Sequence, residues 1–208
     1  MVFLWSSFLL AYLRTRGGPY GLVTVAAEWL GPTSVGGVHD HLRVQGVFVF
    51  PVGQSSGFFG SLPSLGVHVN DIVGIVASPG GGGYFLVGKD GGVFTFGNAP
   101  FFGSLPGIGV HVNDITGIAS TPDGQGYHVV GADGAVYAFG DATSQGSLPG
   151  LGVTVSNIVN IVPTPDGLGY WLIGSDGGVF AFGDATSQGS LPGAGVHVNN
   201  IVGAVPTG

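Results

Sequence analysis

Residues 169–183 read Gly-Tyr-Trp-Leu-Ile-Gly-Ser-Asp-Gly-Gly-Val-Phe-Ala-Phe-Gly, and this stretch decides the fold. The run Gly169–Gly174 is apolar and aromatic, which favours a strand over a turn. Asp176-Gly177 then supplies the positive φ that a tight hairpin turn requires. The following run Val179–Phe182 carries aromatic rings at alternate positions, as one face of a strand does. The stretch therefore predicts an antiparallel hairpin with at least one apolar face.

This hairpin belongs to a repeat of 43 residues. The hexapeptide Phe58–Pro63 returns at Phe101–Pro106, and its Gly-Ser-Leu-Pro part returns within Ser144–Pro149 and Ser187–Pro192. The interval is 43 residues each time, without insertion. Self-similarity at a fixed period of this size is typical of architectures in which neighbouring repeats bury each other's apolar faces.

Each repeat is predicted to hold four short strands. In the third repeat the apolar run Ile158–Thr164 precedes a Pro-Asp-Gly turn and forms the first strand, and Ser187–Leu191 forms a fourth, weaker one. Four strands in such a repeat fit a β-propeller blade, whose usual period is about 40–50 residues. A β-trefoil is the runner-up, but two Asp-Gly hairpins per repeat favour the propeller. We expect an all-β, β-propeller-like array of four-stranded 43-residue repeats.

The repeats divide the chain into two regions. Residues 1–44 share no clear pattern with the rest and form a non-repeat N-terminal segment, and residues 45–208 form the repeat domain. The repeat domain consists of a half unit (45–57), three full units (58–100, 101–143 and 144–186) and a partial unit (187–208). Ile201–Pro206 can pair beside Gly46–Phe50 and complete a composite blade, within one chain or between two. Because an open ring exposes unpaired strand edges, we expect self-association.

Composition excludes several classes of protein. Only four residues are basic and the formal net charge is −7, which disfavours nucleic acid, whose phosphates need Lys and Arg. Cysteine is absent, so neither disulfides nor thiolate-bound zinc can form. The apolar run at residues 2–13 is shorter than the roughly 20 residues of a transmembrane helix. Its positive charges follow rather than precede the run, so we expect no convincing signal peptide.

The unit resembles the GYW-L-DGGVF-FGDA-GS repeat of secreted and cell-surface proteins of actinobacteria. The matching residues here are Gly169–Leu172, Asp176–Phe180 and Phe182–Ala185. The resemblance covers residues 58–208, with Asn98 in place of Asp and Ala135 in place of Gly as departures. It implies a propeller-like fold, a bacterial source and an extracellular or cell-surface location. It carries over no catalytic residues.

Asparagine and aspartate recur just before the first strand of each repeat. Calcium prefers six to eight oxygen ligands from carboxylates, amides and backbone carbonyls. A propeller can gather one such set per blade around its channel. The sequence thus offers calcium as a candidate cofactor, with the candidate ligands Asn70, Asp71, Asn113, Asp114, Asn157 and Asn199. The Asp-Gly turns are explained by hairpin chemistry alone.

Two kinds of catalytic side chain stand out. Ser55 lies in a Gly-x-Ser-x-Gly pentapeptide, the pattern of a nucleophile elbow, although a strand rather than a helix is predicted to follow it. His68, His111 and His197 occupy one position of the repeat and are candidate bases, or they simply face solvent.

Aromatic pairs mark the second strand of each repeat, and successive residues of a strand point to opposite faces. One member of each pair is expected in the core. The other can line a ligand cleft or lie between blades, and the candidate ligand-binding residues are Phe85, His128 and Trp171.

Two functions follow. The first is a repeat-built binding or interaction module of a bacterial secreted or surface protein, whose partner is a glycan, another small molecule or a protein. The alternative is a calcium-assisted hydrolase that opens lactones or esters, an analogy at the level of the fold.

Overall fold

The computed structural model describes residues 11–12, 22–33, 40–51 and 59–204, with side chains for residues 59–204. The described elements are β-strands joined by turns and by single turns of 3-10 helix. The chain divides into an N-terminal part, Met1–Ile72, and a C-terminal part, Val73–Gly208. No helix in the described residues is long and apolar enough to cross a membrane. The predicted all-β class is confirmed.

The N-terminal part contains one antiparallel sheet of order β1-β2-β3. Its strands are β1 (Ala11–Tyr12), β2 (Leu22–Thr33) and β3 (Asp40–Pro51), and η1 (Pro63–Leu65) follows them. The strand β3 crosses the predicted boundary between residues 44 and 45. It includes the half-repeat sequence Gly46–Phe50.

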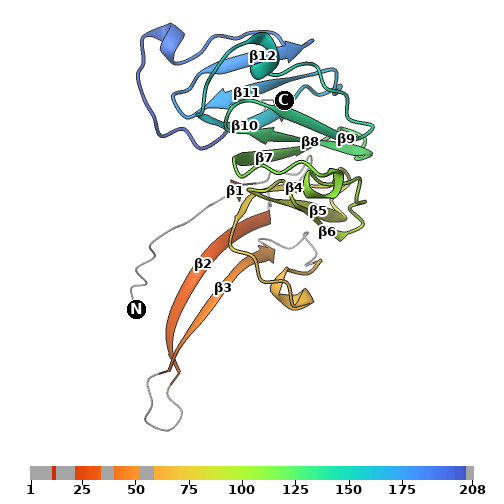
Figure 1. Ribbon diagram of the computed structural model, residues 1–208, viewed down its shortest axis with the longest axis vertical. Helices are drawn as coiled ribbons and strands as arrows, with labels where there is room; N and C mark the ends of the chain where they lie inside the picture. Colours follow the sequence, from red (N-terminus) through yellow and green to blue (C-terminus); the bar gives the residue numbers. More distant parts are fainter. Residues whose placement is uncertain (1–10, 13–21, 34–39, 52–58, 205–208) are drawn as a thin grey trace. The chain divides into compact units, whose positions relative to one another are not determined.

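Three further sheets follow in chain order, and each has three antiparallel strands. Figure 1 shows them stacked one above another. The strand β4 starts at Ile72, at the division between the two parts, and the other strands lie in the C-terminal part. The sheets are β4 (Ile72–Ala77), β5 (Gly83–Gly88) and β6 (Val93–Gly97); β7 (Ile115–Ser120), β8 (Gly126–Gly131) and β9 (Val136–Gly140); and β10 (Ile158–Pro163), β11 (Gly169–Gly174) and β12 (Val179–Gly183).

The predicted hairpin is confirmed in its register. Tyr170 pairs with Phe182 and Leu172 pairs with Phe180 across β11 and β12. In the turn, Gly177 has φ 76°, a conformation that side chains with a Cβ disfavour. The Asp176 carboxylate accepts a hydrogen bond from Gly178 N at 2.9 Å and closes the turn. Asp-Gly is therefore present for backbone geometry.

The predicted fourth strand is not confirmed. Residues 184–190 contain no strand, and the equivalent segments of the earlier repeats contain none either. One reason is backbone conformation, because Gly103 and Gly146 have φ of 126° and 123°, outside the range of a strand. A second reason is that the Gly146 carbonyl accepts from the Tyr170 hydroxyl, not from a neighbouring strand. The described sheets form no closed barrel or closed propeller.

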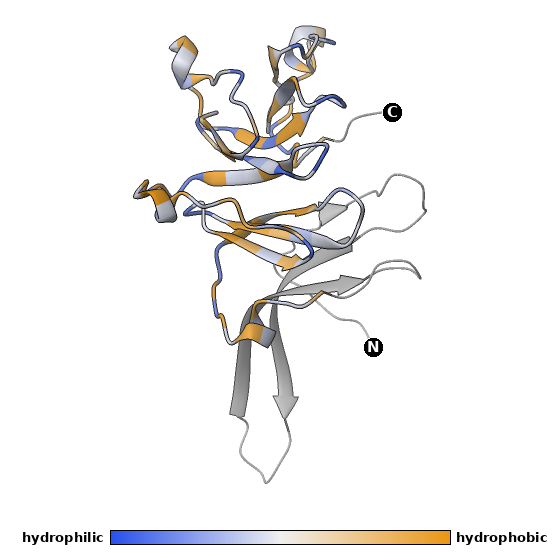
Figure 2. Ribbon diagram, turned by 90° about the vertical axis from the view of Figure 1, so that its right-hand side faces the viewer, coloured by the Kyte–Doolittle hydropathy of each residue, from blue (hydrophilic) through white to orange (hydrophobic). Residues whose placement is uncertain are grey.

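The central strands β5 and β8 are buried on both faces. Every residue of β5 and β8 is buried, including the aromatic pairs Tyr84–Phe85 and Tyr127–His128. A strand with one solvated face would alternate between buried and exposed residues. For β8 this follows because its sheet lies between the sheets β4–β6 and β10–β12. Figure 2 shows hydrophobic residues along the strands of these sheets. One such core joins Phe85 and Leu105 to Ile115 and Tyr127 of the next sheet.

Leucine in the Gly-Ser-Leu-Pro motif connects these layers. Leu148 N donates to Gly134 O at 3.2 Å, in the second hairpin turn of the preceding repeat. A methyl group built on Gly134 would lie 2.6 Å from Leu148 Cδ1, so only glycine leaves room for the leucine. The leucine side chain is 1 % exposed and packs with Ile158 and Tyr170 of the next sheet. The motif and the turn are thus two halves of one contact.

Glycine also lets the first strands of neighbouring sheets approach each other. A methyl group built on Gly74 of β4 would lie 3.5 Å from the Cα of Gly117 in β7. One built on Gly117 would lie 3.7 Å from the Cα of Asn160 in β10. These three residues occupy one position of the repeat. The first strands therefore lie side by side in chain order.

Replacing Leu148 by Ala should lower the free energy of unfolding by about 2–5 kcal/mol, because the side chain leaves a cavity between two sheets. Leu151, three residues later, is 69 % exposed. Its replacement by Ala should change stability by no more than about 0.5 kcal/mol. Urea denaturation of both variants measures the difference. Equal losses for the two variants would show that Leu148 does not join the sheets.

Candidate functional site

The loops between successive sheets have one recurring conformation. In residues 104–109 the Ser104 hydroxyl accepts from Gly107 N at 3.3 Å, and Leu105 is buried beneath the loop. Pro106 opens η2 (Pro106–Ile108), and Gly109, with φ 75°, ends it. The geometry recurs in η3 (Pro149–Leu151) and η4 (Pro192–Ala194). We call residues 104–111, 147–154 and 190–197 the rim turns.

The rim turns direct an apolar side chain into solvent. Ile108 is 62 % exposed and Leu151 is 69 % exposed, and they occupy the same position of the repeat. Burial of Leu105 and Leu148 holds the turns in place, so these exposed residues have no part in the core. In the N-terminal part, Leu65 lies on the equivalent turn η1 and is 65 % exposed.

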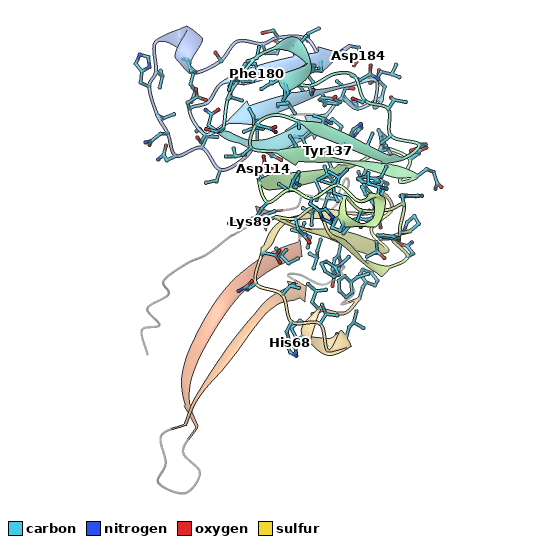
Figure 3. The ribbon with its side chains drawn as sticks, in the orientation of Figure 1. His68, Lys89, Asp114, Tyr137, Phe180 and Asp184 are labelled. Atoms are coloured by element: carbon cyan, nitrogen blue, oxygen red, sulfur yellow. The ribbon has the colours of Figure 1, made fainter. Side chains whose placement is uncertain are left out.

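The predicted histidine bases lie beside these turns. His111 and His197 are exposed and come three residues after Ile108 and Ala194, and Thr154 takes the place of His in the third repeat. His68 is exposed in the same way after η1 (Figure 3). The prediction that these side chains can simply face solvent fits their placement. Their role as bases stays a prediction, and Ser55 lies outside the described residues.

The candidate calcium ligands are only partly gathered. Asp114 is exposed near Asp133: a methyl group built on Gly131 would lie 2.7 Å from Asp133 Oδ1 and 3.4 Å from Asp114 Oδ2. Asn157 has the same relation to Gly174 and Asp176. Asn70, Asn113 and Asn199 are exposed, and Asp71 is partly buried. Within the described residues, no three His, Asp or Glu side chains lie close enough together to hold a metal ion.

Sequence reasoning did not bring together two pairs of carboxylates. Asp123, in the first turn, neighbours Asp141, which follows the third strand, and Asp166 neighbours Asp184 in the next repeat. The sequence signal that could have indicated these pairs is the recurrence of the two aspartates at the same spacing in both repeats. In the earlier repeat Gly80 and Asn98 stand at these positions, and Ser78 Oγ donates to Asn98 Oδ1 at 3.2 Å.

The two carboxylates of the Asp123–Asp141 pair differ in pKa. Loss of hydration, together with the hydrogen bond and charge of Asp123, raises the pKa of Asp141. The Gln125 backbone N–H and the Thr121 hydroxyl donate to Asp123 and lower its pKa. Asp141 therefore holds its proton to higher pH than Asp123.

The predicted aromatic binding residues differ in exposure. Phe85 and His128 are buried, whereas Trp171 is partly buried. His128 Nε2 lies 2.9 Å from Thr143 O, and Trp171 Nε1 donates to Thr186 O at 2.9 Å, so the two rings bind equivalent carbonyls. Phe85 lacks a donor at this position. Trp171 is therefore better placed to stack on a ligand than the buried Phe85 and His128.

The surroundings of His128 disfavour its charged form. Its Nδ1 is buried and has no hydrogen-bond partner among the described residues. Its ring lies against Tyr170, with centroids 5.2 Å apart. Burial lowers the pKa of His128, although Thr143 O and the charge of Asp141 oppose this. Nε2 therefore carries the proton and donates to Thr143 O.

No protein-family model and no curated protein matches the sequence. Among solved structures, the chain is similar to a putative 6-phosphogluconolactonase from Bacteroides uniformis, with 17 % identity and a TM-score of 0.41. The match covers 85 % of this chain and 53 % of that one, so this chain spans about half that protein's length. Similarity at this level shows neither a shared fold nor a shared activity.

Stability should fall as the pH drops below the ordinary histidine pKa of about 6.5. The lowered pKa of His128 makes the unfolded chain bind protons first, which favours unfolding. His128→Phe, which installs the residue of the earlier repeat, should reduce this loss. Urea denaturation at about pH 7 and about pH 5 measures this loss of stability. His111→Asn, a substitution of an exposed histidine, is the control. An unchanged pH dependence in His128→Phe would contradict the assignment.

Asp141→Asn should become more stable relative to wild type as the pH rises from about 4 to 7. The raised pKa of Asp141 means that its ionisation favours the unfolded chain in this window, and the amide removes that effect. The reverse change, Asn98→Asp, is the control, because Gly80 supplies no second carboxylate. Chemical denaturation at both pH values measures the difference. A stability difference between Asp141→Asn and wild type that is the same at both pH values would argue against the carboxylate pair.

Proposed function

We propose that this protein is a noncatalytic interaction module of a bacterial secreted or surface protein. We further propose that it is built as a β-propeller-like array and binds a polymeric glycan through its rim turns. The observation that carries the proposal is the repeated exposure of Ile108 and Leu151 on equivalent turns. Neither side chain serves the core, and both are presented by the same local structure.

The chemistry of the rim turns fits a sugar ring. A sugar offers an apolar C–H face together with hydroxyl groups that donate and accept hydrogen bonds. The rim turn at residues 104–111 offers Ile108 as apolar surface, and Phe101, three residues before this turn, adds an exposed ring. The exposed His111 and Asn113 follow as polar groups. Apolar lining with a few polar groups is the usual composition of a binding site for small organic groups.

Repetition favours a polymer over a single small molecule. When several weak sites engage one chain, each further contact is intramolecular, and avidity rises without a new kind of contact. The stacked sheets and the close approach of Gly74 to Gly117 support a propeller-like arrangement. The resemblance of the repeat to those of secreted actinobacterial proteins supports the location.

The alternative remains a calcium-assisted hydrolase of lactones or esters. Its candidate ligands include Asp114 and Asn157, and its candidate bases are His68, His111 and His197. Asp114 and Asn157 each lie beside an aspartate of the second turn, but residues 59–204 gather no three His, Asp or Glu side chains at one place. The observed exposure of the rim turns favours the interaction module.

Wild-type protein should be retained on insoluble bacterial peptidoglycan, and Ile108→Ser/Leu151→Ser should weaken its binding about tenfold or more through loss of avidity. Leu168→Ser is the matched control, because Leu168 is 59 % exposed on a different turn. Co-sedimentation over a range of glycan concentrations measures the binding.

Two outcomes would count against this function. The first is absence of retention, or equal retention of wild type and the double variant. The second is opening of acyl lactones by the wild type that requires calcium and stops with EDTA, which would favour the hydrolase.

A further inference from the structure

The last, partial repeat follows the path of the complete ones. Leu191 N donates to Gly177 O at 3.1 Å, and Ile201 N donates to Ser175 O at 3.0 Å. The equivalent bonds one repeat earlier are Leu148 N to Gly134 O and Ile158 N to Ala132 O, at 3.2 and 3.0 Å. Residues 191–204 therefore lie where a complete repeat has the loop before its first strand and the first strand itself.

The leucine of this repeat lacks the cover that the others have. Leu105 and Leu148 are 0 % and 1 % exposed, whereas Leu191 is 36 % exposed. The earlier leucines pack beneath the second and third strands of the following sheet. In the described residues, no such strands follow Leu191.

The glycine before this leucine shows the same difference. A methyl group built on Gly146 would lie 3.0 Å from Phe182 Cδ1, and Gly146 O accepts from the Tyr170 hydroxyl. A methyl group built on Gly189 would have no atom within 4 Å. At Gly146 the aromatic ring of Phe182 from the next sheet covers the backbone. At Gly189 the equivalent backbone surface is exposed.

The segment that follows is an open edge. In complete repeats the first strand pairs with the second, as Ile161 of β10 pairs with Leu172 of β11. Residues 201–204 lie beside β10, because Asn160 Nδ2 donates to Ala204 O at 3.0 Å. Val202 is 84 % exposed. We call Gly189, Leu191 and residues 201–204 the C-terminal face.

The β2–β3 hairpin has the register of the missing strands. Its Gly46-Val47-Phe48-Val49-Phe50 run matches Gly178–Phe182 of the third repeat. Val23 pairs with Phe50 as Tyr170 pairs with Phe182. On its other edge, β2 pairs with β1 at Thr24 and Val23, and from Val25 onward the described residues place no other strand beside it.

We propose that the C-terminal face binds the β2–β3 hairpin of a second copy of this chain. This interface continues the sheet-to-sheet contact that already joins the repeats within one chain, and it is independent of the glycan proposal. Closure on the chain's own hairpin would make a ring of about four blades, the lower end of the usual range of about 4–8. Two copies joined head to tail would make a ring of about eight blades. Each blade of that ring would be rotated relative to its neighbour by half the angle of a four-blade ring.

Light scattering on the full chain tests the interface. The wild type should have a mass about twice the 20.8 kDa of one chain. Val202→Asp should shift it to a single copy, because a charge on the edge opposes strand pairing. Leu151→Asp, the same change on a rim turn, should leave the mass doubled. A single-copy mass for the wild type at every concentration, or a doubled mass for Val202→Asp, would overturn the proposal.

Cysteine cross-linking identifies the occupant, because the chain has no natural cysteine. The positions equivalent to Ile161 and Leu172 are Ala204 and Val25. Antiparallel partners lie about 4.5–5.5 Å apart at Cα, within reach of a disulfide. A mixture of Ala204→Cys and Val25→Cys proteins should form a cross-linked dimer, whereas Leu151→Cys with Val25→Cys should not. Absence of cross-linking in a mixture that still associates would overturn the hairpin as occupant. An intrachain disulfide in the double variant at low concentration would overturn the second copy.

Discussion

The contact between the leucine of each Gly-Ser-Leu-Pro motif and the glycine of the preceding hairpin turn supports the rest of this structure. Leu148 reaches its buried place only because Gly134 has no Cβ. From there it packs against Ile158 and Tyr170 of the next sheet. This leucine thus joins the hairpin turn of the preceding repeat to the core of its own. A chain with many glycines and few charges gains a core because each repeat buries its apolar faces against its neighbour.

This dependence separates the residues that serve the core from those that are free for another role. In the rim turns at 104–111 and 147–154 the motif buries its leucine and exposes the apolar residue three positions later, so Ile108 and Leu151 face solvent at no cost to packing. The same rule explains the C-terminal face. Leu191 is bound to its own turn but has no following sheet, and its exposure is the direct result. Binding at the rim and association at the end are therefore separate properties of one repeat.

Sequence reasoning succeeded where short-range chemistry decides the structure. The strands at 158–163, 169–174 and 179–183 and the turn at Asp176-Gly177 follow from alternation and from positive φ. The fourth strand failed because Gly146 adopts φ 123° and its carbonyl binds Tyr170. That tyrosine lies 24 residues away and in the next sheet. A contact of this kind leaves no local pattern.

The candidate site divides in the same way. The sequence by itself determined the period, the hairpins and the recurrence of histidine, aspartate and aromatic residues, because these depend on neighbours in the chain. Only the tertiary structure decided that His128 is buried with a lowered pKa, that Asp123 meets Asp141, and that Ile108 faces solvent. Burial and charge at these residues depend on how sheets stack and on where distant turns meet. The stacking of the sheets and the meeting of these turns are set by packing between repeats. The sequence of a single repeat does not contain that information.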